Sequence, residues 1–378
     1  MDKPDNKVNW ERANWTVALL SVICLCIFTY IFTQWQQNGS FLPVWGDSSQ
    51  IGDEQTNGSY YTLYDQETKE AIEYMSRKVS VGDELLTGDN KHYRVTKLDG
   101  LNAYCELLAQ REMKQVLAQL HSAAETVSTQ TGPFRSVAIY STHTDESYVP
   151  TSGTESKNGG GDILDVATTM VTVLEDQGIE VVHSDNIHDP HDVNAYQRSR
   201  KTAAELLQDG PAAIIDVHRD GVPDPEYYAT EFDGEAATQI RLVVGRQNQN
   251  SEANIAFAEK MKAYYDEVKP GLIKSIFMAK GNYNQDLAPN SVLLEVGTHT
   301  NSLEQAEVGA REFAEALPQF LGLKSATEQP NAAGQTQAGQ AAAKQDSSGI
   351  SKAILWLVGI ALVGGLGFVW ISRGTLKR

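Results

Sequence analysis

The feature that most constrains the fold is an alternation of short apolar runs with longer amphipathic stretches between residues 133 and 323. The apolar runs are continuous rather than alternating, which is typical of strands buried on both faces. Such alternation predicts an α/β domain in which helices flank a mixed, largely parallel sheet. The predicted strands are 136–142, 179–183, 212–217, 240–245 and 291–297, and the predicted helices are 162–177, 194–208, 252–268 and 303–318.

Two uncharged runs of 19 residues each, 15–33 and 353–371, are long enough to cross the hydrocarbon core of a membrane. Basic residues flank them in the N-terminal segment 1–14 and in the C-terminal tail 372–378. The positive-inside rule therefore predicts a protein of the cell membrane with both termini in the cytoplasm. Everything between the two predicted spans is then extracytoplasmic.

Four further segments lie between the spans and the α/β domain. Residues 58–108 contain short alternating stretches broken by Gly-Asp and Asp-Gly turns, which predicts a small β-rich module. No group of catalytic residue types occurs in this module, so its expected role is a passive spacer or docking module. The other segments are expected to be a linker over 34–57, a helical connector over 109–132 and a low-complexity tether over 324–350.

The chain is strongly acidic, with a formal net charge of −18. Nucleic-acid binding requires clustered Lys and Arg, so this composition argues against a nucleic-acid partner. Three cysteines, two of which lie in the first apolar run, are too few for a disulfide framework.

Polar residues that follow or interrupt the predicted strands are the candidate site. His143 and Glu146 follow the first strand in an HxxE spacing, His218 follows the third, and Glu295 lies in the last. Because ligands collect at the carboxyl ends of the strands in such sheets, these side chains are expected to meet. Two imidazoles and a carboxylate suit a catalytic zinc site, and a second carboxylate would serve as general acid and base.

Other residues compete for these roles. Asp162 and Asp165 are rivals to Glu146 as the carboxylate ligand, although acids also suit the start of a helix. In the loop HSDNIHDPH, His183 and His191 are expected to be ordinary surface residues, whereas His188 orders the loop near the site. Arg219, His299 and Asn301 also lie near the site in sequence. Arg219 either binds a substrate carboxylate or an oxyanion, or simply pairs with Asp220.

Several motifs, in order along the chain, resemble the stage II sporulation protein P family over roughly residues 58–322. The β-rich module contributes Val81-Gly-Asp83-Glu and Tyr93-Arg-Val. The α/β region contributes the rest, which are Tyr140-Ser-Thr-His143-Thr-Asp-Glu146-Ser-Tyr148-Val-Pro150, Ile187-His188-Asp189, Tyr196-Gln-Arg-Ser-Arg200, Ile215-Asp-Val-His218-Arg219-Asp220, Tyr283-Asn-Gln-Asp286-Leu and Leu294-Glu295-Val-Gly297.

The resemblance implies a zinc-dependent N-acetylmuramoyl-L-alanine amidase that removes stem peptides from peptidoglycan, with an accompanying endopeptidase activity. It implies His143, Glu146 and His218 as zinc ligands and Glu295 as the catalytic acid and base. In related amidases the carboxylate ligand lies farther from the first histidine, which keeps Asp162 and Asp165 open as alternatives. Arg219, His188 and Asn284 are candidate substrate-binding residues.

The same resemblance implies a role in sporulation engulfment beside a membrane protein and a lytic transglycosylase. The family pattern has a single N-terminal span, so the second predicted span at 353–371 departs from it. Two other functions fit the same fold: a non-catalytic peptidoglycan-binding scaffold and a metallo-carboxypeptidase that trims stem peptides.

Overall fold

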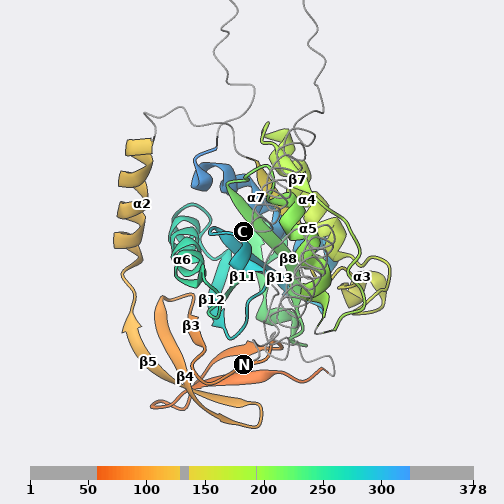
Figure 1. The fold of residues 1–378 in the computed structure, drawn as a ribbon. Helices are drawn as coiled ribbons and strands as arrows, with labels where there is room; N and C mark the ends of the chain where they lie inside the picture. Colours follow the sequence, from red (N-terminus) through yellow and green to blue (C-terminus); the bar gives the residue numbers. More distant parts are fainter. Residues whose placement is uncertain (1–57, 128–135, 193, 324–378) are drawn as a thin grey trace, which may run out of the picture. The chain divides into compact units, whose positions relative to one another are not determined.

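The computed structural model describes residues 58–127, 136–192 and 194–323, which belong to one compact unit (Figure 1). Both predicted membrane spans, the linker, the tether and the two termini lie outside the described residues. Among the helices of the described ranges, none combines the length and the apolar character that a membrane crossing requires.

An 11-stranded mixed sheet runs through the described residues in the order β2-β1-β5-β4-β3-β12-β11-β13-β8-β6-β7. Within this sheet, the α/β strands form the parallel pairs β7·β6, β6·β8, β8·β13 and β11·β12 and the antiparallel pair β11·β13. The strands of this region are β6 (Val137–Tyr140), β7 (Val181–His183), β8 (Ala213–Asp220), β11 (Ile240–Gly245), β12 (Ile273–Ala279) and β13 (Ser291–Thr298).

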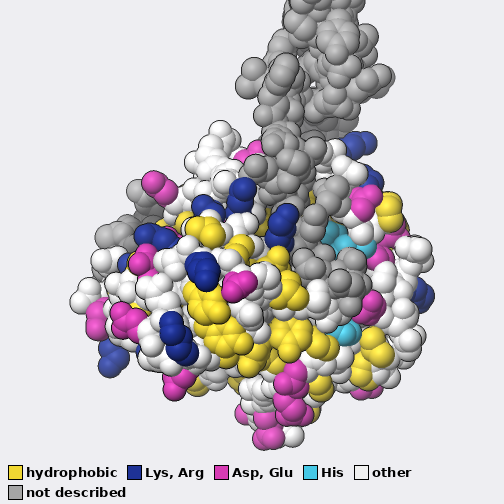
Figure 2. All heavy atoms as spheres, turned by 90° about the horizontal axis from the view of Figure 1, so that it is seen from below, with side chains coloured by type: hydrophobic (Ala, Val, Ile, Leu, Met, Phe, Trp, Pro, Cys, Tyr) yellow, Lys and Arg dark blue, Asp and Glu magenta, His cyan; other side chains and the backbone are white. Residues whose placement is uncertain are grey.

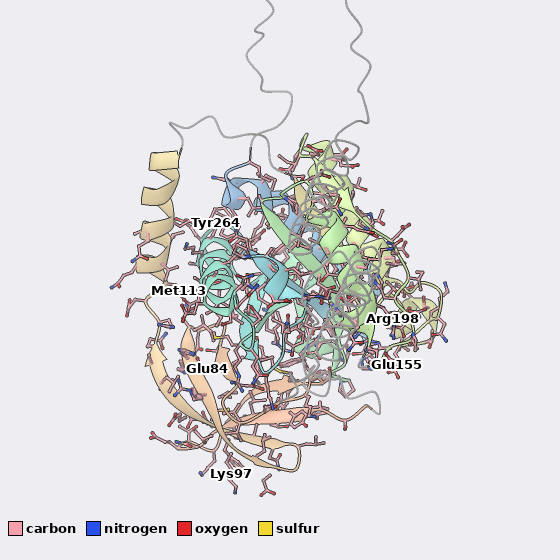
Figure 3. The ribbon with its side chains drawn as sticks, viewed as in Figure 1. Glu84, Lys97, Met113, Glu155, Arg198 and Tyr264 are labelled. Carbon is pink, nitrogen blue, oxygen red and sulfur yellow. The ribbon has the colours of Figure 1, made fainter. Side chains whose placement is uncertain are left out.

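Helices pack on one face of the α/β part of this sheet. Alternate residues of the central strands pack with α4, α6, α7 and the start of α2 in one large buried cluster, to which Met113 and Tyr264 belong (Figure 3). The helices are α2 (Met113–Val127), α3 (Val149–Ser152), α4 (Ile163–Asp176), α5 (Ala195–Leu206), α6 (Ser251–Val268) and α7 (Leu303–Leu321). Ser302 starts α7 with a capping box that it shares with Gln305.

The opposite face is covered by α5 and by the β-rich module. Val243, Phe277 and Leu293 of the central sheet belong to the same buried cluster as the inward-facing side chains of the module. The module strands are β1 (Tyr61–Asp65), β2 (Ala71–Met75), β3 (Glu84–Leu86), β4 (Lys91–Asp99) and β5 (Asn102–Gln110). β3 pairs antiparallel with β12, so the module continues the central sheet and buries one of its faces.

The outer side of the module carries half-buried tyrosines. Tyr64 stacks on Tyr104 with 6.0 Å between ring centroids, and Tyr74 meets Tyr227 edge-on at 5.2 Å. Viewed from below, hydrophobic side chains gather in one area of this end of the molecule, with Lys, Arg, Asp and Glu around it (Figure 2).

The structure adds elements that the sequence patterns did not predict. Strand β12 was not expected, because Lys274 and Ser275 interrupt its apolar run. The antiparallel pair β9 (Ala229–Phe232) and β10 (Glu235–Thr238) and the short 3-10 helices Pro225–Tyr227 and Gln285–Leu287 were also not expected. β8 extends through Asp220, so His218 lies within a strand rather than after it.

Candidate metal centre and active site

Three side chains capable of binding a metal meet at the ends of β6 and β8. His143 Nδ1 and His218 Nδ1 each lie 3.1 Å from the same oxygen, Glu146 Oε1. All three side chains are buried, and their potential ligand atoms lie within 4.8 Å of one another. Two imidazoles and one carboxylate in this arrangement match the donor set of a catalytic zinc site with three protein ligands.

Asp216 lies next to the ring of His218, at the nitrogen that does not face Glu146. It lies two residues before His218 in β8, so both side chains point to the same face of the sheet. Asp216 Oδ1 is 3.0 Å from His218 Nε2, and its carboxylate accepts hydrogen bonds from Thr142 N and Thr142 Oγ1 at 2.8 and 2.7 Å. A carboxylate behind a metal-ligating histidine fixes its ring orientation and raises its basicity. Sequence reasoning missed Asp216, although a charged residue inside the apolar run of β8 was a signal for it.

Backbone contacts hold Glu146 in place between the two histidines. Arg219 N donates a hydrogen bond of 2.8 Å to Glu146 Oε2, and Ile163 N donates one of 3.0 Å to Glu146 O. Gly161 packs so closely that a Cβ there would lie 2.2 Å from Glu146 O. Only glycine fits at this position, and the start of α4 is thereby held against the HxxE segment.

The two rival carboxylates lie elsewhere. Asp162 accepts hydrogen bonds from Tyr148 N and Ser152 Oγ at 3.0 and 2.5 Å, and it lies outside the group of potential metal ligands. Asp165 is in the first turn of α4, where its charge suits the helix dipole. The structure therefore places Glu146, rather than either aspartate, between His143 and His218.

Glu295 approaches the centre from the neighbouring strand. It pairs in register with His218 across the parallel strands β13 and β8. Its Oε1 accepts hydrogen bonds of 3.1 and 2.5 Å from Nε and Nη2 of Arg77, a buried residue of the β-rich module. Sequence reasoning did not identify Arg77, because no local pattern connects residues 218 positions apart.

Burial and neighbouring charges strongly shift the pKa values of the two histidines. Burial and the neighbouring His191 lower the pKa of His143 to about 4, so its imidazole is neutral near pH 7. Burial alone would lower the pKa of His218, but the carboxylates of Asp216 and Glu146 raise it to about 10. The position of His218 thus attracts a positive charge. A metal ion would supply that charge in place of the proton.

His191 differs from the expected surface residue. Its ring stacks on that of His143 with 3.8 Å between centroids, and its Nδ1 lies 3.3 Å from Asp145 Oδ1. The expectation was wrong because it judged the loop from its polar composition, whereas the fold turns the loop back over β6. Arg198, labelled in Figure 3, fixes this loop by donating from Nε to His188 O at 2.6 Å.

Two of the three candidate substrate-binding residues make hydrogen bonds within the protein. His188 uses both ring nitrogens within the protein, Nδ1 with Ser141 O at 2.9 Å and Nε2 with Thr202 Oγ1 at 2.8 Å. Asn284 donates to Tyr196 O at 2.9 Å. Both contacts join separate segments, so these polar groups stabilise the walls of the site.

Arg219 is buried beside the centre. Its Nη2 donates to Glu155 O at 2.9 Å, and Glu155 is labelled in Figure 3. His299 and Asn301 follow β13 and make hydrogen bonds within the protein. His299 O accepts from Val149 N at 2.8 Å, and Asn301 Oδ1 accepts from Thr298 N at 2.9 Å.

Taken together, the centre offers three buried potential ligands and, on the strand next to His218, a further buried carboxylate, Glu295. Burial raises the pKa of Glu295 to about 7, although Arg77 opposes that rise. A carboxyl group with such a pKa can both accept and release a proton near neutral pH. The arrangement is suited to metal-assisted hydrolysis of a carbonyl compound.

Comparison with known proteins yields a family. The family model described as "Stage II sporulation protein P (SpoIIP)" matches residues 56–318. Stage II sporulation protein P of Bacillus subtilis (strain 168) is 29% identical over 209 residues, which cover 50% of this chain and 52% of that protein. The chain thus spans about half the length of this curated relative.

Two solved structures also show similarity. The catalytic domain of CwlV, an N-acetylmuramoyl-L-alanine amidase from Bacillus (Paenibacillus) polymyxa var. colistinus, has 18% sequence identity, and the CwlD amidase from Clostridioides difficile, in complex with the GerS lipoprotein, has 13%. Each match covers 50% of this chain and 99% of the other, with a TM-score of 0.32. A TM-score this low does not establish a shared fold, so no function is inferred from either structure.

Proposed function

Because this chain belongs to the stage II sporulation protein P family, we propose that it is a zinc-dependent N-acetylmuramoyl-L-alanine amidase that removes stem peptides from peptidoglycan. The observation that carries the proposal is the group of His143, Glu146 and His218 with Glu295 beside it. Three neutral or anionic N and O ligands and a nearby proton carrier are the parts that zinc amide hydrolysis requires.

In this proposal each residue has a defined task. His143, Glu146 and His218 hold the zinc, and Asp216 keeps the His218 ring in position. The bound zinc would polarise the amide carbonyl and lower the pKa of a water molecule. Glu295 would take a proton from a water molecule as the water oxygen bonds to the carbonyl carbon, and would deliver that proton to the leaving nitrogen as the amide C–N bond breaks. The products are a carboxylate and a free amine, and no covalent intermediate with the protein forms.

The biological setting is part of the same proposal. Membership of a sporulation family supports a role in spore formation, with wall remodelling during engulfment as the specific step. The two uncharged runs at 15–33 and 353–371 support anchoring in the cell membrane with the catalytic region outside the cytoplasm. An endopeptidase activity on peptide cross-links, and a complex with a membrane protein and a lytic transglycosylase, complete the proposal.

The test is digestion of purified sacculi by the full chain in detergent, followed by mass spectrometry of the released products. We expect whole stem peptides, loss of release after chelation, recovery with Zn²⁺, and one zinc per chain. A Glu295→Ala protein that folds, keeps zinc and still releases stem peptides would overturn the proposal.

The same products distinguish the two alternative functions. A metallo-carboxypeptidase would release single amino acids from the ends of stem peptides. A non-catalytic scaffold would bind sacculi without producing new amino termini.

A further inference from the structure

The position of Arg77 gives the β-rich module a part in catalysis. We propose that Arg77 is the positioning residue of the catalytic carboxylate, and that the module completes the active site by supplying it. The inference rests on the proposed function, because it gives Glu295 the role of acid and base. It replaces the expectation that the module is a passive spacer.

The contact between Arg77 and Glu295 is specific in geometry. Two of the three guanidinium nitrogens, Nε and Nη2, donate to the same oxygen, Oε1. The other oxygen, Oε2, is buried and has no hydrogen-bond partner among the described residues. Arg77 therefore fixes the carboxylate in one orientation and leaves Oε2 as the atom that exchanges the proton.

The guanidinium is itself held by the walls of the site. Arg77 Nη1 donates to Tyr196 Oη at 3.3 Å, and the guanidinium lies 5.3 Å from the centroid of the Tyr283 ring. Tyr196 also meets the ring of His143 edge-on, with 5.4 Å between centroids. Arg77 thus links the carboxylate to the aromatic groups around the metal ligands.

A buried network of hydrogen bonds and ion pairs fixes the position of Arg77 beside Glu295. Ser76, the residue before it, hydrogen-bonds to Asp220 at the end of β8, and Ser76 Oγ accepts from Gly221 N at 2.9 Å. Asp220 is also paired with Arg241 of β11, whose Nη2 donates to Glu73 Oε1 of β2 at 2.9 Å. These contacts tie the end of β2 to the two strands beside β13, so the orientation of Glu295 depends on docking of the module.

The free-energy cost of burying Arg77 and Glu295 together favours a functional role for this ion pair. Burying a charge pair costs desolvation free energy that packed apolar side chains would not cost. A free buried carboxylate could instead rotate away, and a misplacement of about 1 Å in a catalytic group lowers the rate by about 10²-fold. Arg77 keeps Glu295 in a single geometry beside the metal centre.

The test compares Arg77→Ala and Arg77→Lys with Arg246→Ala in the full chain. Arg246 is a matched control, because it also joins the α/β region to the module, through Asp83 at 2.9 Å, but makes no contact with Glu295. We expect Arg77→Ala to lower kcat by about 10²-fold with KM and zinc content unchanged. Arg77→Lys should recover part of that loss, and Arg246→Ala should stay within a few-fold of the parent. Equal kcat values for Arg77→Ala and Arg246→Ala would overturn the inference.

A second measurement does not depend on activity. Thermal unfolding of Arg77→Met, Glu295→Gln and the double variant forms a double-mutant cycle. Removing one partner leaves a buried charge or polar group unpaired, so the double variant should lose less in Tm than the sum of the single losses. Additive losses would show that the two side chains are not coupled.

The two proposals can fail separately. If the parent chain releases no stem peptides, the proposed function fails, and the cycle still decides whether Arg77 holds Glu295. If Arg77→Ala does not fold, the kcat of Arg77→Lys against that of Arg246→Ala decides the catalytic part.

Discussion

Glu146 and Glu295 are both buried carboxylates of the same site, but their surroundings shift their pKa values in opposite directions. Burial would raise the pKa of each. At Glu146 the charge of His218, followed by the hydrogen bonds from His143 and His218, more than offsets burial and lowers the pKa well below its ordinary value. At Glu295 burial dominates, and the pKa rises to about 7 despite the ion pair with Arg77.

The difference separates the two roles. A carboxylate that stays ionised at every relevant pH is suited to hold a cation. A carboxyl group that titrates near neutrality is suited to carry a proton. Two acids in one site with pKa values pushed apart by their environments are a general sign of such a division of labour. The division follows from position, since Glu146 lies between two imidazoles and Glu295 faces a single guanidinium.

The strongest test of these different roles is to neutralise each carboxylate in turn. We expect Glu146→Gln to lose bound zinc and all measurable stem-peptide release. Glu295→Gln should keep one zinc per chain while its kcat falls by about 10²- to 10⁴-fold, the usual contribution of general acid–base catalysis. Metal analysis beside a sacculus assay separates the two outcomes. Zinc loss in both variants would show that Glu295 is also a ligand.

The contact between Asp216 and His218 predicts an effect of intermediate size on zinc affinity. Asp216→Asn removes the negative charge next to His218 Nε2 and should weaken zinc affinity by about 10- to 100-fold, which competition with a chelator would measure. Asp286→Asn is the control, because Asp286 pairs with Arg200 at 2.7 Å and lies outside the group of potential metal ligands. Unchanged zinc affinity in Asp216→Asn would remove Asp216 from the metal centre.

The close packing of Gly161 against the backbone of Glu146 predicts a smaller effect, on stability. Gly161→Ala would place a methyl group 2.2 Å from Glu146 O, so the backbone must shift. We expect a loss of about 1–3 kcal/mol in the free energy of unfolding, together with weaker zinc binding. Gly159→Ala has open space around its Cβ but a φ of +86°, so it should cost about 1–2 kcal/mol without affecting zinc. Equal zinc affinities in the two variants would contradict this account.

The smallest effect concerns the pH dependence of stability in the chelator-treated protein. Glu295 has a folded pKa of about 7 against an ordinary value of 4.5, so the folded state binds its proton more tightly than the unfolded state. Its contribution to stability is complete below pH 4.5 and is lost as the pH rises to about 7. The Tm of Glu295→Gln relative to the parent should therefore rise across this window. A pH-independent difference in Tm would mean that Glu295 is not held with a raised pKa.

The sequence predicted most of the α/β core correctly, for a physical reason. The continuous apolar run of β6 would lose too much free energy if exposed, so its burial as a strand is set locally. Where polar residues interrupt the run, as Lys274 and Ser275 do in β12, the pattern fails. That strand forms because β11 and β3 pair with it on both sides.

The candidate ligands show the same limit. His143, Glu146, His218 and Glu295 were chosen from their places at strand ends or within apolar strands, and the structure brings the four together. The choice among Glu146, Asp162 and Asp165 stayed open, because sequence spacing alone does not say which carboxylate turns toward the histidines. His191 and Arg77 were not identified, because both reach the site through packing between separate segments. Asp216 was also missed, although it lies two residues before His218 in the same strand.

The family, the α/β alternation and the chemical types of the centre follow from the amino-acid sequence alone, since they depend on local apolar patterns and short motifs. That the β-rich module shares the sheet and brings Arg77 to Glu295 follows only from the folded structure. The reason is that an ion pair between residues 218 positions apart has no local energetic signature. It forms when β3 pairs with β12 and the buried network of Asp220 and Arg241 fixes the end of β2.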